Sequence, residues 1–340
     1  MRAIHSEPTL ALRLPPIMVW GPPGVGKSAV LREVAEEEGI GFIDIRLAQR
    51  EPVDLRGLPV PDGDVVRWLL ASEWPRDPAS RGILLFDELT AADRSLQVAA
   101  YEILLDRRLG DLYRVPPGWL LLGAGNRASD RAVATSMSSA LANRFCHLEI
   151  TPDLEGWVAW ANQRGLDPLV AGFLRFRPAL FLEMSGALDR GWPSPRSWER
   201  VAHELAVARQ TGLDDTLLRL VLGGLVGAGP AAELLAFREM TEQYDIVALL
   251  AGAPLTHLPE RADQRYGLCT GLAWHLWRVQ DRPRAIGAFL DIGRRLPADF
   301  ATMALVDAVR DADTDRLLSV ITHPQYAAWV AEHGSVLGRS

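Results

Sequence analysis

Short apolar runs alternate with amphipathic segments over the first 150 residues of the chain. The segments at 28–38 and 94–105 place their apolar side chains at the spacing of one helix face, whereas the runs have the length of buried strands. We expect strands at 17–20, 41–45, 82–86, 119–124 and 146–150. This alternation is typical of an α/β fold, in which helices cover a parallel β-sheet.

Two segments interrupt the alternation, and each has the signature of a hairpin. Residues 58–68 carry Asp62 and Gly63 between β-prone flanks, and residues 107–119 contain Gly110 followed by Asp111. Glycine beside aspartate suits the left-handed backbone of a tight β-turn. Both hairpins are therefore expected as inserts in the α/β core.

After residue 151 the pattern changes to helical segments rich in alanine, leucine and tryptophan, with breaks at Gly165, 191–195, Gly212 and 227–230. We expect three parts: an αβα core over 1–151, a small helical domain over 152–228 and a further helical region over 229–340. The tryptophans of the helical part lie at helical spacings or beside helix starts, which predicts core packing. They are Trp157, Trp160, Trp192, Trp198, Trp274 and Trp277.

Composition narrows the classes of protein that remain open. The chain has 340 residues, of which 48% are hydrophobic and 23% charged, so it can bury a sizeable core. It has no uncharged apolar run of about 18 residues, and its start lacks the apolar segment of a signal peptide. We therefore expect a cytoplasmic protein without a membrane span. The net charge of -7 and the lack of a basic tract argue against unspecific binding to nucleic acid.

The cysteines and histidines give no sign of a transition-metal site. Cys146 and Cys269 are far apart and form no CxxC pair, so we expect two plain buried thiols. The seven histidines form neither an HxxxH nor an HExxH pair. Arginine supplies nearly all of the positive charge, and Lys27 is the only lysine of the chain.

That single lysine stands in a phosphate-binding motif. The segment GPPGVGKS follows the apolar run 17–20 and precedes a helical segment, which is the context that GxxxxGK[ST] requires. Its glycines let backbone N–H groups surround phosphates, while lysine reaches the β- and γ-oxygens and the hydroxyl ligates Mg²⁺. The nucleotide site is predicted to comprise Gly21, Pro22, Pro23, Gly24, Val25, Gly26, Lys27 and Ser28. A strand-to-helix turn without a ligand is the alternative.

Three further positions have side chains that suit this site. The apolar run 82–86 ends in Asp87 and Glu88, at the carboxyl edge of the expected sheet. There Asp87 can hold Mg²⁺ and Glu88 can polarise the attacking water. Asn126 ends another apolar run and can position the water or sense the γ-phosphate, although a turn-forming asparagine is equally compatible with its place beside glycine.

Taken together, these motifs resemble those of the AAA+ ATPases, and within them the MoxR family. The resemblance covers about residues 10–205, in the order GPPGVGKS, LLFDEL, GAGNR, LANRF and SPRSWERV. It implies a P-loop NTPase fold of AAA+ type, with a parallel αβα sandwich followed by an α-helical lid and a helical C-terminal region. It also implies ATP and Mg²⁺ as cofactors and a homo-oligomeric ring, which in this family is expected to be a hexamer.

The same resemblance assigns roles to four polar residues. Asn126 looks like the sensor-one residue, Arg144 in LANRF looks like the arginine finger that reaches a neighbour's ATP, and Arg196 resembles the sensor-two arginine of the lid. Arg127 beside the sensor is expected to be structural or to act between subunits. The two hairpins resemble inserts that face the centre of the ring and contact a partner.

The function implied is ATP-driven remodelling of a separate protein client, often with a partner that carries a von Willebrand factor A domain. A nucleic-acid translocase on the same core is one alternative, and a basic central face would mark it. A chelatase-like ATPase that drives metal insertion is another. A nucleotide-gated scaffold without activity is disfavoured because both Lys27 and Glu88 are present.

Overall fold

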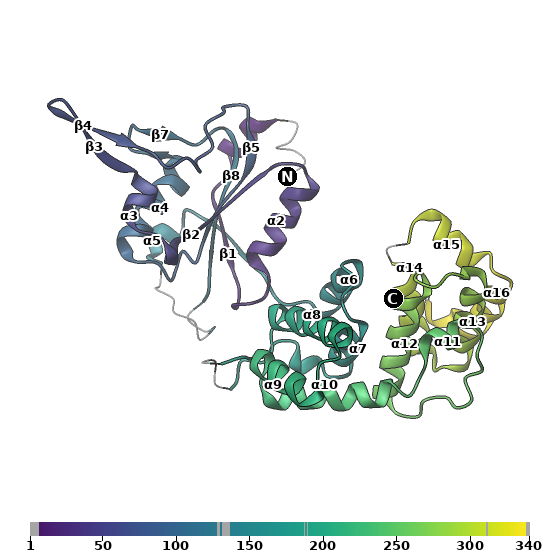
Figure 1. Cartoon of the computed structure of the whole chain (residues 1–340). Helices are drawn as coiled ribbons and strands as arrows, with labels where there is room; N and C mark the ends of the chain where they lie inside the picture. Colours follow the sequence, from purple (N-terminus) through teal and green to yellow (C-terminus); the bar gives the residue numbers. More distant parts are fainter. Residues whose placement is uncertain are drawn as a thin grey trace. The chain divides into compact units, whose positions relative to one another are not determined.

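The computed structural model describes residues 7–127, 130, 137–186, 188, 190–310 and 312–337. Two compact units are present, one ending at Thr151 and the other beginning at Pro152. The first holds a parallel sheet flanked by helices and the second is helical, so the predicted fold class is confirmed (Figure 1). The further division of the helical part after residue 228 stays a prediction.

Five parallel strands form the central sheet of the first unit, in the order β2-β5-β8-β1-β9. They are β1 (Ile17–Trp20), β2 (Gly41–Arg46), β5 (Arg81–Asp87), β8 (Gly118–Gly125) and β9 (Cys146–Glu149). Each end lies within one residue of its predicted position. In the register, Trp20 of β1 lies opposite Gly125 of β8. The residues that follow these two therefore start from the same carboxyl edge of the sheet.

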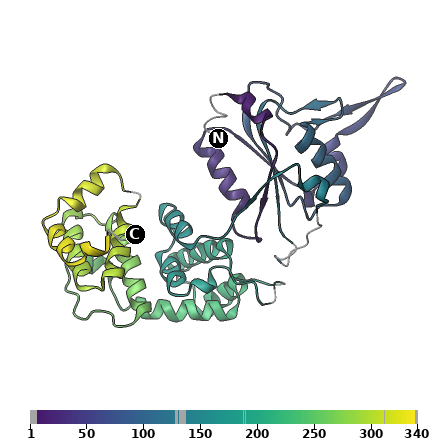
Figure 2. The same ribbon diagram turned by 180° about the vertical axis from the view of Figure 1, so that it is seen from behind.

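Helices cover both faces of this sheet. Figures 1 and 2 show α2 (Lys27–Glu37) on one face and α4 (Arg94–Asp106) on the other. Alternation along β5 matches this arrangement, because Leu85 belongs to the hydrophobic cluster of α2 and Phe86 to that of α4. Shorter elements of the unit are η1 (Pro8–Leu12), η2 (Leu47–Gln49), α3 (Pro52–Arg56) and α5 (Ser139–Ala142).

One bulky side chain explains two glycines at the start of neighbouring strands. A Cβ atom at Gly82 would lie 2.6 Å from the ring of Trp119, and one at Gly41 would lie 2.9 Å from it. The indole of Trp119 is buried and donates a hydrogen bond from Nε1 to Ser80 Oγ at 2.9 Å. Glycine is therefore required where this ring crosses the sheet.

Both hairpins are present as antiparallel pairs. The first joins β3 (Leu58–Asp62) to β4 (Val65–Leu69), and the second joins β6 (Arg108–Leu109) to β7 (Tyr113–Arg114). Their turns contain Gly63 and Gly110, with φ values of 62° and 49°. The first hairpin is unusual in exposing large apolar side chains, namely Leu58, Val65, Val66, Trp68 and Leu69.

The second unit consists of helices, and its earlier elements are α6 (Leu154–Gln163), α7 (Pro168–Phe176), η4 (Pro178–Leu180), α8 (Pro195–Thr211), α9 (Asp215–Val226) and α10 (Ala228–Thr241). Its later elements are α11 (Ile246–Leu250), α12 (Ala262–Leu276), α13 (Arg282–Arg295), α14 (Ala298–Val309), α15 (Thr314–Ile321) and α16 (Pro324–Leu337). The two longest connections lie between η4 and α8 and between α11 and α12. One hydrophobic cluster gathers α6 to α10 and another gathers α11 to α16. Within the described ranges, none of the helices has the length and apolar character needed to cross a membrane.

Two expectations about individual side chains need correction. Cys146 is exposed because it lies on β9, at the edge of the sheet, whereas Cys269 is buried as predicted. Trp198 is fully buried, but Trp157, Trp160, Trp192, Trp274 and Trp277 are only partly buried. Helical spacing alone therefore did not separate core tryptophans from those near the surface.

Candidate nucleotide-binding site

The loop between β1 and α2 has the backbone shape of a phosphate cradle. Gly24 and Gly26 have φ values of 79° and 93°, in the left-handed region that glycine adopts most readily. Gly26 is the N-cap of α2 and has no side chain to occupy the free N–H groups of the first turn, which contains no acidic residue. These N–H groups and the helix dipole together suit an anion.

The loop is packed on one side and open on the other. A Cβ atom at Gly21 would lie 2.7 Å from the carbonyl oxygen of Ile150, so the loop begins in close contact with the chain after β9. A Cβ atom at Gly26 would meet no atom within 4 Å. The glycine at the helix start thus faces open space, as a cradle for a bulky phosphate chain requires.

Lys27 connects the loop to the end of the neighbouring strand. Its Nζ donates to the carbonyl oxygens of Gly21 at 2.7 Å and Pro22 at 3.0 Å, and to Asn126 Oδ1 at 2.8 Å. The pairing of β1 with β8 explains this meeting, because Gly21 and Asn126 follow directly on paired residues. The structure therefore brings the predicted lysine and the predicted sensor residue into direct contact.

Asp87 and Glu88 leave the sheet at the same edge. Strand alternation places Asp87 on the face that α2 covers, as for Leu85 two residues before it. Asp87 Oδ1 accepts a hydrogen bond from the Glu88 N–H at 2.8 Å. Glu88 has a φ of 58°, a left-handed conformation that costs a residue other than glycine about 1–3 kcal/mol. Strain of this kind is concentrated at functional sites, which agrees with the predicted role of Glu88.

Thr90 is a residue of the site that the sequence patterns did not identify. It is 2% exposed, and its Oγ1 accepts a hydrogen bond from the Asn126 N–H and donates one to the Asn126 carbonyl oxygen, both at 3.3 Å. A Cβ atom at Gly125 would lie 2.7 Å from Thr90 Oγ1. Thr90 thus positions the backbone of Asn126, and Gly125 leaves room for it.

Asp44 adds a second carboxylate near Asp87. It lies on β2, whose Arg46 is paired with Asp87 in the sheet. Burial raises the pKa of the Asp44 carboxyl, and the negative charge of Asp87 raises it further. Asp44 Oδ1 is buried and has no hydrogen-bond partner among the described residues. Asp44 Oδ2 forms ion pairs with Arg32 at 3.5 Å and with Arg46 at 3.7 Å, so this part of the sheet edge offers carboxylate oxygens whose negative charge is partly balanced.

These residues fit Mg²⁺ bound together with a nucleotide. Mg²⁺ takes oxygen ligands, and proteins commonly supply only one or two of them because phosphate oxygens and water provide the rest. The Ser28 hydroxyl and the Asp87 carboxylate are the side chains that would hold it. Across the described residues no cluster of three or more His, Cys, Asp or Glu side chains could bind a metal ion by itself. The donor set thus suits a cation that arrives with phosphate.

The three arginines singled out from the sequence lie in different settings. Arg144 is exposed between α5 and β9, and no described residue forms an ion pair with it. Arg127 is paired with Asp130 at 3.3 Å and with Glu149 at 3.2 Å. Arg196 lies in the second unit, exposed in the first turn of α8. The roles predicted for Arg144 and Arg196 stay predictions.

Comparison with known proteins gives structural similarities alone. No family model matches the chain, and no curated protein matches it. A variant of RuvB from Thermotoga maritima is 14% identical with a TM-score of 0.39, and 74% of each chain is covered. NtrX from Brucella abortus in complex with ADP is 17% identical with a TM-score of 0.40, over 99% of this chain and 66% of that one. Similarities of this strength indicate neither a shared family nor a shared activity.

Proposed function

We propose that this chain is an ATPase of AAA+ type that binds Mg-ATP at Gly21–Ser28 and hydrolyses it. The observation that carries the proposal is the contact of Lys27 with Asn126 across the ends of β1 and β8. It joins a loop shaped for phosphate to a polar residue suited to sensing the γ-phosphate. The strained Glu88, which follows Asp87 at the same sheet edge, supplies a base-like carboxylate.

Each side chain then has one task. The loop N–H groups and Lys27 hold the β- and γ-phosphates, and on binding ATP the Lys27 ammonium exchanges its carbonyl partners for phosphate oxygens. Ser28 and Asp87 would hold Mg²⁺, which would supply positive charge against the phosphates. Glu88 orients and polarises the attacking water, while Asn126 keeps it in line with the γ-phosphate.

We further propose that the ATPase works as a ring, a hexamer by resemblance to the MoxR family, and remodels a protein partner. A von Willebrand factor A domain protein is the expected kind of partner. The exposed apolar residues of the β3–β4 hairpin support a protein client, because nucleic acid is bound mainly through basic groups. The net charge of -7 also favours a protein client over nucleic acid.

Chemical modification of Lys27 tests nucleotide binding directly. Since Lys27 is the only lysine, an amine-acetylating reagent has one side-chain target besides the α-amino group. We expect Mg-ATP to protect Lys27 from acetylation, measured by peptide mass spectrometry. Mg-AMP should protect it far less, because AMP lacks the β- and γ-phosphates. The α-amino group, modified equally in every sample, is the internal control.

The variant Lys27→Ala tests nucleotide binding through the thermal stability of the protein. At ATP about 100-fold above its dissociation constant, binding should stabilise the wild-type protein by about 2.7 kcal/mol, and the variant should lose this gain. Thermal unfolding with and without Mg-ATP measures it. Two outcomes together would exclude this loop as the nucleotide site: equal acetylation of Lys27 with and without ATP, and stabilisation of the variant by Mg-ATP to the same extent as the wild type.

The ATPase rate should distinguish a protein client from nucleic acid. We expect unfolded casein to stimulate turnover, and single- or double-stranded DNA to leave it unchanged at moderate salt. Replacing Val66 and Trp68 with serine should abolish the stimulation while the basal rate stays within about twofold, since these side chains are exposed. The control is Val207→Ser, an equally exposed position on α8. Salt-sensitive stimulation by DNA would instead favour a nucleic-acid motor.

A further inference from the structure

A cleft of about 460 Å³ opens in the second unit, and none of its lining residues has been assigned to the nucleotide. It lies between the end of α6, the end of α12, α14 and the start of α15. Its size is in the range of sites that hold drug-sized ligands or a few peptide side chains. The residues that give it its chemistry are Gln163, Trp274, Trp277, Arg278 and Arg316.

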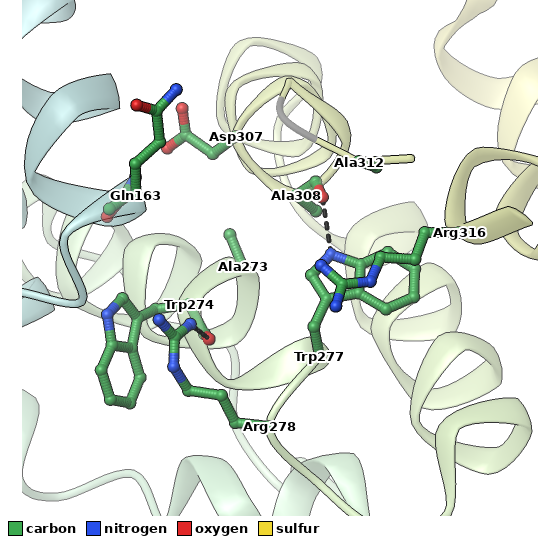
Figure 3. A pocket seen from close by; sticks show the side chains of 10 residues that line it. Gln163, Ala273, Trp274, Trp277, Arg278, Asp307, Ala308, Ala312 and Arg316 are labelled. Carbon is green, nitrogen blue, oxygen red and sulfur yellow. Dashed lines mark hydrogen bonds between the residues drawn. The ribbon is translucent and has the colours of Figure 1, made fainter. Parts of the chain in front are cut away.

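Two arginine–tryptophan pairs form opposite sides of the cleft, with Ala273 between them (Figure 3). The Arg278 guanidinium lies 3.8 Å from the ring centre of Trp274, and that of Arg316 lies 5.6 Å from the ring centre of Trp277. Trp277 Nε1 donates to the Ala308 carbonyl oxygen at 2.7 Å, which fixes its ring. Stacking holds the planar guanidinium groups without using up all of their N–H donors.

The cleft has more positive charge than negative charge available to a ligand. Arg278 has no ion-pair partner among the described residues, and its Nη1 donates only to the Trp274 carbonyl oxygen. Burial lowers the pKa of the Arg278 guanidinium, and the charge of Arg316 lowers it further. Asp307, the carboxylate in the lining, is already bound to Arg175 at 3.0 Å. Arg316 has a single exposed partner, Asp313, at 3.6 Å.

We propose that this cleft binds a protein segment that presents a carboxylate next to an apolar side chain. The carboxylate would lie between Arg278 and Arg316, whose forked donors match its geometry. The apolar side chain would rest against Ala273 and the tryptophan rings. Tryptophan and arginine are also the residue types that dominate binding energy at protein interfaces. Charge complementarity thus selects an acidic segment, and the apolar walls select a peptide over a simple anion.

Fluorescence anisotropy tests the proposal on the full chain, without nucleotide. The probes are labelled hexapeptides in which one glutamate stands beside leucine, phenylalanine, tryptophan or proline. Each has a partner peptide with glutamine in place of glutamate. At least one glutamate peptide should bind, and its glutamine partner should bind at least about tenfold more weakly, since a charge-assisted hydrogen bond is lost.

Variants locate the binding. Arg278→Gln and Arg316→Gln should each lower the affinity for the peptide by at least about tenfold. Arg219→Gln, which replaces an exposed arginine on α9, should leave the affinity unchanged. Arg278→Lys keeps the positive charge but loses the paired N–H donors that can bind a carboxylate bidentately, so an intermediate affinity is expected. Thermal unfolding shows whether each variant is folded. Lys27→Ala should bind the peptide with the same affinity as the wild type. Peptide binding can therefore be tested whether or not the proposed ATPase activity is found.

Four results would overturn the proposal. One is that no peptide binds at concentrations up to about 1 mM. A second is that glutamate and glutamine peptides bind equally, and a third is that folded Arg278→Gln and Arg316→Gln bind as the wild type does. The fourth is that propionate alone competes with the peptide at the peptide's own concentration, because the apolar walls would then contribute nothing.

Discussion

Replacing Glu88 with glutamine is expected to leave ATP binding intact and to lower turnover by about 10²- to 10⁴-fold. Glutamine keeps the size of the side chain and its ability to hydrogen-bond, but it cannot act as a base-like group toward water. The phosphates are held by the loop and Lys27, not by Glu88, so affinity should not change. Phosphate release and equilibrium binding of a fluorescent ATP analogue, measured on the same preparation, separate the two effects.

Two other variants make this result specific. Glu36→Gln removes one carboxylate at the exposed end of α2 and should hydrolyse ATP at the wild-type rate. Glu88→Gly should be as inactive as Glu88→Gln yet more resistant to thermal unfolding, because glycine adopts a φ of 58° without strain. If Glu88→Gln turns over near the wild-type rate, another residue activates the water.

The strain at Glu88 connects the local fold to the chemistry. The Leu89 N–H donates to the Ala124 carbonyl oxygen at 2.9 Å, and the Glu88 carbonyl oxygen accepts from the Ala91 N–H at 2.9 Å. These bonds turn the chain sharply after β5 and fix Leu89 against the end of β8. Glu88 is held in its unfavourable conformation by the hydrogen bonds on either side of it.

The central sheet could be predicted closely because each strand is a short apolar run with polar or glycine boundaries. Strands buried on both faces leave a continuous apolar signal, so β5 and β8 are visible without any alternation. The motif residues could be placed for a related reason. Parallel strands end at one edge, so Gly21, Asp87 and Asn126 had to leave the sheet on the same side.

Residues that act through tertiary contacts left no such signal. Thr90 holds Asn126 through two hydrogen bonds, and Asp44 lies near Asp87 on a strand that is distant in sequence. Neither belongs to a motif. Trp274 and Trp277 have the spacing of core residues, yet both line a cleft, where each ring lies against an arginine guanidinium. Periodicity shows which residues share a helix face, but it does not show what packs on that face.

Arg144 distinguishes a site shared between subunits from one contained in a single chain. Its side chain is exposed, and no described residue forms an ion pair with it, so it is available to a neighbouring subunit. In a ring, a neighbour's guanidinium would neutralise the charge that develops on the γ-phosphoryl group. Arginine fingers contribute about 10³- to 10⁵-fold to the rate. Arg144→Ala should therefore bind ATP nearly as well as the wild type and lose turnover by a factor of that order.

Mixing two inactive variants gives the sharper measurement. A ring that contains both Arg144→Ala and Glu88→Gln chains has some interfaces at which an intact Glu88 meets an intact Arg144, so activity should return on mixing. Each variant alone at the same total concentration is the control, and Arg219→Ala, which removes an exposed arginine of the second unit, should remain active. Full activity of Arg144→Ala alone would show that Arg144 is not the finger. Mixed rings that form, as judged by co-purification of differently tagged chains, yet stay inactive would contradict independent shared sites.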